Sequence, residues 1–99
     1  MALHRIPAVY MRGGTSKGVF FLGRHLPAEP AERDRLLLRV VGSPDRYGKQ
    51  IDGMGGATSS TSKVVLVSRS SQPDCDVDYL FGQVPIDAPR IDWSGSCGN

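Results

Sequence analysis

A glycine-rich loop that leads into a short apolar run most constrains how this chain can fold. Three of the four residues 53–56 are glycines, which allow backbone conformations and close approaches that other residues resist. Thr58–Ser62 then places hydroxyl groups at successive positions, and Lys63 follows directly. Because the next run, Val64–Val67, is apolar and mostly β-branched, it predicts a buried strand. The rest of the chain is expected to be organised around this loop and strand.

Lys63 is a candidate proton carrier because it stands at the entrance of that strand. A lysine on a rigid element can be partly desolvated, which favours its neutral form and suits it to proton transfer. A solvated lysine at the end of a loop is the commoner explanation of such a pattern taken alone. The local sequence therefore nominates Lys63 without deciding between the two.

The composition allows at most one small domain and excludes several classes of protein. Ninety-nine residues with an ordinary apolar fraction can form a small core. A net charge of +2, with the basic residues scattered, does not favour a nucleic-acid partner. The longest apolar runs have four or five residues, too few to span a membrane, and residues 1–7 do not resemble a signal peptide.

The cysteines and histidines do not form a recognisable metal site. Cys75 and Cys97 lack the spacing of metal ligands, and His4 and His25 are isolated. Nothing in the sequence supports a disulfide between the two cysteines, although it does not exclude one. A cytoplasmic protein with reduced thiols and no bound metal is therefore expected.

One segment, residues 27–41, is predicted to be a helix. Pro30 suits its first turn, and Gly42 supplies the stop after its last. Its buried stripe is expected from the apolar residues at helical spacing, which are Leu36, Leu37, Val40 and Val41. Its solvated face is expected from Arg33, Arg35 and Arg39.

Four segments are predicted to be strands: residues 6–11, 19–22, 64–67 and 76–84. The first two are expected to form a hairpin around the loop 12–18. In the last strand, one face is expected to carry Val77, Tyr79 and Phe81, and the other Asp76, Asp78 and Leu80. Trp93 is expected to be a packed anchor beyond that strand.

The loop between the first two strands is a candidate anion site. It contains glycines and two cations, Arg12 and Lys17, and backbone N–H groups in such a turn suit a carboxylate or a phosphate. The glycine and lysine spacing is not that of a phosphate-binding Walker A loop. A hairpin turn with polar tips is the commoner explanation of this pattern.

Cys97 is the better placed of the two cysteines for chemistry. It lies in a small-residue turn, 94–99, of the kind that opens a helix, whose free N–H groups would stabilise a thiolate and bind an anion. A small buried thiol in a tight turn explains the pattern equally well. Cys75 is a poor candidate because Asp74 and Asp76 disfavour its thiolate. Because no helix follows the turn, an N-terminal fragment of a longer protein is expected.

Five motifs closely resemble the start of the 2-methylaconitate cis–trans isomerase family of the PrpF type. This family also contains 4-oxalomesaconate tautomerases and shares the fold of diaminopimelate epimerase. The motifs cover nearly the whole chain and are Met11–Phe21, Gly42–Asp45, Gln50–Lys63, Asp78–Val84 and Asp92–Asn99.

The resemblance implies an α+β fold in which a curved, mainly antiparallel sheet wraps round a central helix. It implies that residues 1–99 are an incomplete N-terminal domain of a two-domain isomerase, without that helix and without the second domain. Apolar residues of the sheet are then expected to lack their main packing partner, namely Val64, Leu66, Tyr79 and Phe81. The chain by itself is expected to be inactive.

The resemblance also implies a cofactor-free reaction that moves a proton on a small unsaturated di- or tricarboxylate, with 2-methylaconitate favoured. Lys63 and Cys97 match the family's acid and base, and which of them is the acid stays open. The positions expected to bind substrate are Arg12, Gly14, Thr15, Ser16, Lys17, Gly98 and Asn99. No nucleic acid or membrane partner is expected, and a homo-oligomer of the full-length protein stays open.

Two other functions remain open from the sequence. The same loops could belong to a carboxylate-binding accessory module without catalysis, in which Lys63 and Cys97 would be dispensable. The chain could also be the product of a truncated open reading frame without function.

Overall fold

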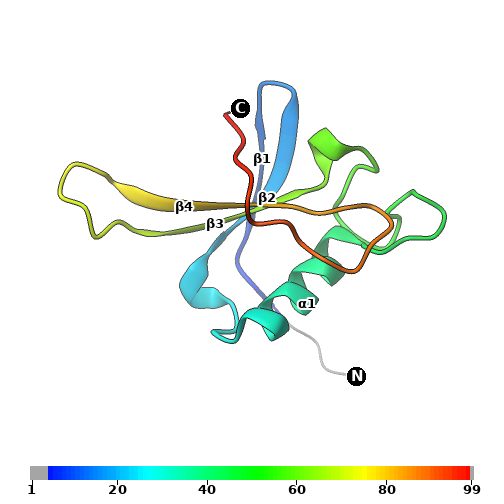
Figure 1. Ribbon diagram of the computed structural model, residues 1–99, viewed down its shortest axis with the longest axis horizontal. Coiled ribbons are helices and arrows are strands. Elements are labelled where there is room, and N and C mark those ends of the chain that lie inside the picture. The colour runs from blue at the N-terminus through cyan, green and yellow to red at the C-terminus, as the bar shows by residue number, and fades with distance from the viewer. Residues whose placement is uncertain (1–4, 99) are drawn as a thin grey trace.

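In the computed structural model, which describes residues 5–98, four strands form one sheet. They are β1 (Val9–Gly13), β2 (Ser16–Leu22), β3 (Lys63–Arg69) and β4 (Val77–Gln83), and they lie side by side in that order. β2 and β3 are parallel, whereas the two outer pairings are antiparallel. The helix α1 (Pro30–Val41) lies within the crossover from β2 to β3 (Figure 1). The expected α+β fold with a mainly antiparallel sheet is confirmed.

One face of the sheet packs against α1 and forms the core. Register pairs Val19 with Val64 and Phe21 with Leu66, so these four side chains share that face. All four are buried with Leu37 of α1. The expectation that Val64 and Leu66 lack a packing partner is therefore wrong, because α1 covers them.

The opposite face of the sheet, here called the open face, carries exposed apolar side chains. Those with between 38 and 57% of their surface exposed are Val9, Met11, Leu22, Val77 and Tyr79. Tyr79 thus lacks cover as expected. Phe81 shares this face with Tyr79 but is only 6% exposed, so the same expectation is wrong for Phe81. Within residues 5–98, no helix is long and apolar enough to cross a membrane.

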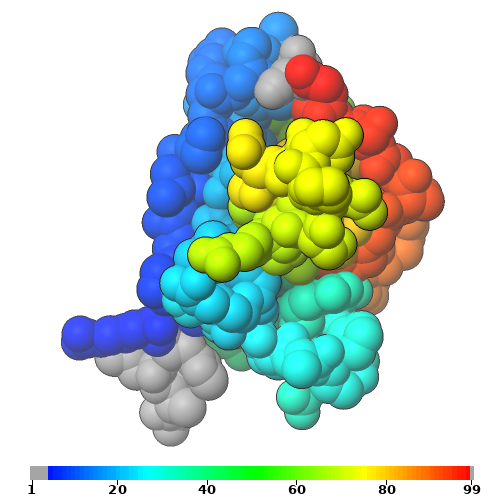
Figure 2. Space-filling model, turned by 90° about the vertical axis from the view of Figure 1, so that its left-hand side faces the viewer, coloured from blue at the N-terminus to red at the C-terminus, as the bar shows by residue number. Residues whose placement is uncertain are grey.

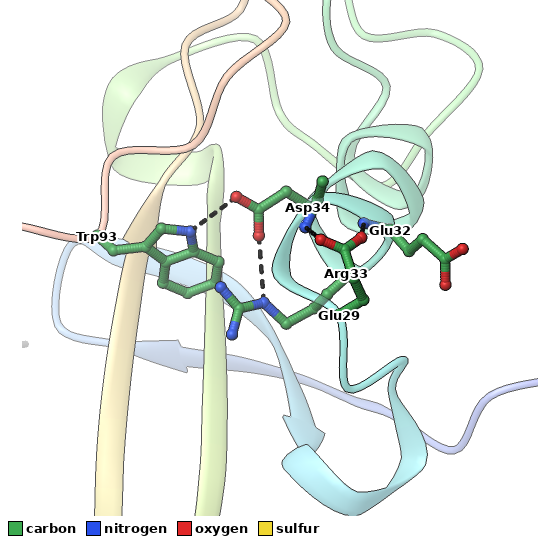
Figure 3. Close-up of polar contacts among 6 residues, drawn as sticks. Glu29, Glu32, Arg33, Asp34 and Trp93 are labelled. Atoms are coloured by element: carbon green, nitrogen blue, oxygen red, sulfur yellow. Dashed lines mark hydrogen bonds and ion pairs between the residues drawn. The ribbon is translucent and has the colours of Figure 1, made fainter.

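The helix ends follow from local chemistry. Glu29 caps the first turn, where its carboxylate accepts hydrogen bonds from Ala31 N (3.1 Å) and Glu32 N (2.8 Å) (Figure 3). Pro30 is the first helical residue, three residues later than the predicted start. Gly42 ends the helix with φ 95°, a left-handed conformation that favours glycine.

The buried stripe of α1 is shifted by one residue from the predicted one. Leu37, Leu38 and Val41 are buried, whereas Leu36 and Val40 are only partly buried at its border. Leu38 was missed because Leu36, Leu37 and Leu38 are consecutive, and spacing alone does not decide which of them face the sheet.

Arg33 is not part of a solvated face, although Arg35 and Arg39 are exposed as expected. Its guanidinium lies 4.7 Å from the ring centre of Trp93, and its Nε is 3.2 Å from Asp34 Oδ1. The indole N–H of Trp93 donates to the other oxygen of Asp34 at 3.1 Å (Figure 3). Trp93 is thus the predicted anchor, and it ties the C-terminal segment to α1.

Gln50 is a buried polar residue that fixes the glycine-rich loop in front of β3. Only 1% of Gln50 is exposed. Its Nε2 donates to Ser43 Oγ (3.0 Å) and Ser62 Oγ (2.7 Å), and its Oε1 accepts from Ala57 N (2.8 Å). Ser62 Oγ in turn donates to the carbonyl of Val84 at 2.6 Å. This network holds Ser62, the residue immediately before β3.

Acid is expected to destabilise this fold through Glu29 and Asp45. Hydrogen bonds from the backbone N–H groups of Glu32 and Ala31 lower the pKa of Glu29 below its ordinary value of 4.5. The backbone N–H of Tyr47 likewise lowers the pKa of Asp45 below 3.8. A carboxyl whose folded pKa is lowered contributes stability above its unfolded pKa, and this stability is lost as the pH falls through the folded value.

The melting temperature should therefore fall between about pH 5 and about pH 2. Thermal unfolding followed by circular dichroism across this range measures the effect. A double variant, Glu29→Gln with Asp45→Asn, should melt lower at neutral pH and depend less steeply on acid. Equal pH dependence in the original and the double variant would show that these two carboxylates do not contribute.

Candidate active site

The hairpin that was expected to bind an anion is tighter than predicted. β1 and β2 pair from Val9 with Phe20 up to Gly13 with Ser16, which leaves a turn of only residues 14–15. Arg12, Ser16 and Lys17 therefore lie in strands, and the predicted loop 12–18 is wrong in its extent. The strands continue because Gly14, with φ 56°, allows a two-residue turn.

Ser16, Lys63 and Cys97 meet at the end of the sheet nearest this hairpin. Lys63 Nζ is 3.6 Å from Cys97 Sγ, and Cys97 Sγ is 3.7 Å from Ser16 Oγ. The C-terminal segment reaches this position by running towards the β1–β2 hairpin (Figure 1), and its surface lies next to the hairpin in Figure 2. Lys63 and Cys97 are half-buried, and Ser16 is buried. Three elements far apart in sequence thus bring an amine, a thiol and a hydroxyl together.

These groups line a small pocket on the open face. Its volume is about 30 Å³, room for a few water molecules at most. Lys17 also lines it, together with Ser16, Lys63 and Cys97. Three aromatic side chains also line the pocket, Phe20, Tyr79 and Phe81. The sequence did not nominate them for the site.

The pocket carries positive charge. Its charged side chains are Lys17 and Lys63, and within residues 5–98 no carboxylate lines it. Tyr79 Oη donates to the carbonyl of Cys97 at 3.4 Å. Burial raises the pKa of the Tyr79 phenol above its usual value of 10, and the charge that Cys97 carries when it is ionised raises it further. The arrangement suits an anionic ligand and a proton exchanged between the amine and the thiol.

Other predicted substrate-binding residues do not line the pocket. Arg12 is exposed, and its Nε donates to the carbonyl of Gly14 at 2.9 Å, so it holds the turn. Gly14, Thr15 and Gly98 are exposed outside the lining. Asn99 lies outside the described residues. Among the described residues, neither Cys75 nor Cys97 forms a disulfide, and Cys75 is exposed beside Asp74.

Tyr79 and Phe81 could in principle have been assigned to the pocket lining from the sequence. Both were expected on one face of the last strand. What was missing was the register, which pairs Phe81 with Val65 and Tyr79 with Val67 and so puts both on the face that carries Lys63.

Iodoacetamide is expected to label Cys97 at least about tenfold faster than Cys75 at neutral pH. Lys63 Nζ lies 3.6 Å from Cys97 Sγ, and a cation beside a thiol favours the thiolate, whereas the group beside Cys75 Sγ is Asp74 Oδ1 at 3.7 Å. Access alone predicts the reverse order, because Cys75 is exposed and Cys97 is half-buried. Mass spectrometry of labelled peptides at a series of times measures both rates. Equal rates, or faster labelling of Cys75, would remove the case for an activated Cys97.

A family model described as "PrpF protein" matches residues 3–99. A protein of Cupriavidus necator named 2-methyl-aconitate isomerase is 68% identical over 96% of this chain and 25% of its own length. A 4-oxalomesaconate tautomerase of Pseudomonas putida is 56% identical over all of this chain and 27% of its own length. The crystal structure of a methylitaconate-delta-isomerase superposes with a TM-score of 0.90 at 51% identity, over 95% of this chain and 24% of that one. The chain thus spans about a quarter of the length of these relatives.

Proposed function

The chain belongs to the PrpF family, and on this premise we propose that it contributes to the active site of an isomerase that moves a proton on a small unsaturated di- or tricarboxylate. The reaction we favour is cis–trans isomerisation of 2-methylaconitate. Two relatives with 67 and 68% identity are named 2-methyl-aconitate isomerase, whereas a relative named 4-oxalomesaconate tautomerase has 56% identity.

The contact between Lys63 Nζ and Cys97 Sγ carries the proposal. One of the two groups removes a proton from the carbon next to a conjugated carboxylate, and the other returns a proton elsewhere on the conjugated system. The anion formed in between places negative charge on the carboxylate. Lys17 and Lys63 can stabilise that charge in a pocket whose described lining contains no acidic side chain. The chemistry that we propose requires no cofactor.

The rest of the proposed site lies outside residues 1–99. We place these residues in an incomplete N-terminal domain of a two-domain isomerase, because the relatives are about four times as long. The exposed apolar residues of the open face, such as Met11 and Tyr79, support a further element packed there. A pocket of about 30 Å³ does not enclose such an acid, which agrees with a second wall supplied by the rest of the protein.

The proposal includes a small carboxylate as the ligand, no nucleic-acid partner and a cytoplasmic location. Cys75 and Cys97 form no disulfide in the described part of the chain, which is compatible with a reducing compartment. A net charge of +2 agrees with a small-molecule substrate rather than a nucleic acid. For the intact protein, a homo-oligomer is compatible with the proposal but not required by it.

The experiment supplies the intact protein containing these residues with separate unsaturated acids and follows their interconversion by NMR. The acids are 2-methylaconitate in its cis and trans forms, 4-oxalomesaconate and 3-methylitaconate. Interconversion of the 2-methylaconitate isomers at the highest rate is expected. Turnover of another acid alone would correct the substrate. Binding without turnover, unchanged by Lys63→Met or Cys97→Ser, would instead indicate a carboxylate-binding module.

A further inference from the structure

Phe81 lies against the ammonium of Lys63 on the open face of the sheet. The centre of its ring is 4.9 Å from Lys63 Nζ, within the range over which a cation is attracted to the face of an aromatic ring. Phe81 is only 6% exposed, so little water competes for the contact. Strand register explains the approach, because Phe81 pairs with Val65, two residues after Lys63, and long side chains reach such diagonal neighbours.

The contact between Phe81 and Lys63 matters because of the other groups that face Lys63 in the pocket. The other charged or titratable side chains of the pocket are Lys17 from β2, Tyr79 from β4 and Cys97 from the C-terminal segment. Among residues 5–98, no carboxylate lines the pocket, so none there balances the charge of Lys63. The contacts that its ammonium makes are with the ring of Phe81 and with the sulfur of Cys97, 3.6 Å away.

We infer that Phe81 is a positioning residue that holds the ammonium of Lys63 against Cys97. The face of the ring attracts the ammonium, and the contact fixes Nζ on the side of the pocket where the sulfur lies. The fixed ammonium favours the thiolate of Cys97. The proposed function does not itself require the contact between Phe81 and Lys63.

The inference also assigns the two proton carriers, and this assignment rests on the proposed function. The Cys97 thiolate accepts the proton that leaves the substrate, and the Lys63 ammonium donates the proton that the substrate regains. The enzyme is then left with a thiol and a neutral amine. A proton passing from Cys97 to Lys63 across their 3.6 Å contact restores the starting state.

The test measures alkylation of Cys97, which needs no substrate. In the intact protein, iodoacetamide labelling of Cys97 is followed by mass spectrometry from about pH 5 to about pH 9, with Cys75 as the internal reference. Phe81→Leu should lower the rate at neutral pH by roughly threefold to tenfold and move the pH profile upwards. Phe81→Tyr keeps the ring face and should stay within about twofold of the original rate.

Two further variants separate positioning from packing. Phe21→Leu makes the same change on the face that packs against α1, where Phe21 is 3% exposed. It should lower the melting temperature and leave the labelling of Cys97 unchanged. In a Lys63→Met protein, where the cation is absent, adding Phe81→Leu should not slow the labelling further.

Unchanged labelling of Cys97 in Phe81→Leu would overturn the inference. An equal loss in Phe81→Tyr or Phe21→Leu would overturn it too, because a general packing defect would then explain the result. A further loss in the Lys63→Met background would show that Phe81 does not act through Lys63. A protein that labels as expected but isomerises no acid would leave the positioning role intact and refute the proposed function.

Discussion

Replacing Lys63 by methionine is expected to lower isomerase turnover by on the order of 10²- to 10⁴-fold, the range that a positioned proton carrier contributes. Methionine has a similar length and is apolar, but it cannot carry a proton. Lys63 Nζ lies 3.6 Å from Cys97 Sγ, so the substitution also removes the cation beside the thiol. Initial rates with 2-methylaconitate, measured at several substrate concentrations, separate a loss of kcat from a change in KM.

Lys49→Met is the matched control for this prediction. Lys49 is an exposed lysine outside the pocket lining, so the same chemical change there should leave turnover within about twofold. Circular dichroism spectra of both variants should match that of the original protein. Turnover of Lys63→Met at more than a tenth of the original rate would exclude Lys63 as a proton carrier.

Replacing Gln50 by alanine is expected to lower the free energy of unfolding by about 3 to 5 kcal/mol. The change deletes the hydrogen bonds to Ser43, Ser62 and Ala57 and leaves a cavity at a residue that is 1% exposed. The loop before β3 should therefore melt together with the fold. Urea denaturation gives the free energy directly.

The neighbouring Lys49 provides the comparison for Gln50 as well. Lys49 is exposed, and Lys49→Ala should change the free energy of unfolding by less than about 0.5 kcal/mol. A loss below about 1 kcal/mol in Gln50→Ala would mean that the network does not hold the loop.

The parts of the fold that could be predicted from the sequence are those set by local chemistry. Pro30 and Gly42 mark the ends of α1 because each has a backbone preference that suits its position. The apolar run after Lys63 forms β3, as its β-branched residues indicate. The Trp93 anchor was also expected.

The parts that could not be predicted depend on contacts between distant segments. Which face of β3 meets α1 follows from the register with β2, and no residue of β3 alone reveals it. For this reason Val64 and Leu66 were wrongly expected to lack cover. The buried hydrogen bonds of Gln50 were missed for the same reason, because its partners Ser43 and Ser62 lie 7 and 12 residues away.

The candidate site, too, contains residues that could be predicted from the sequence and residues that could not. Lys63, Cys97, Ser16 and Lys17 were nominated from the sequence, and the structure brings them to one pocket. Arg12 was nominated for its charge; it lies outside the pocket lining, and its Nε donates to the carbonyl of Gly14. Phe81 was expected only on one face of the last strand. Its contact with Lys63 could not be predicted, because it requires β3 and β4 to pair in one particular register.

The central claim is that Lys63 and Cys97 move a proton on an unsaturated carboxylate. The most direct test incubates the intact protein with 2-methylaconitate in heavy water and follows deuterium in the recovered acid by NMR and mass spectrometry. Proton transfer through a thiol and an amine that exchange with solvent predicts that deuterium enters the carbon skeleton, and that Cys97→Ser and Lys63→Met each slow its entry by at least about a hundredfold. Isomerisation without any deuterium entering, or entry in both variants as fast as in the original protein, would contradict the account.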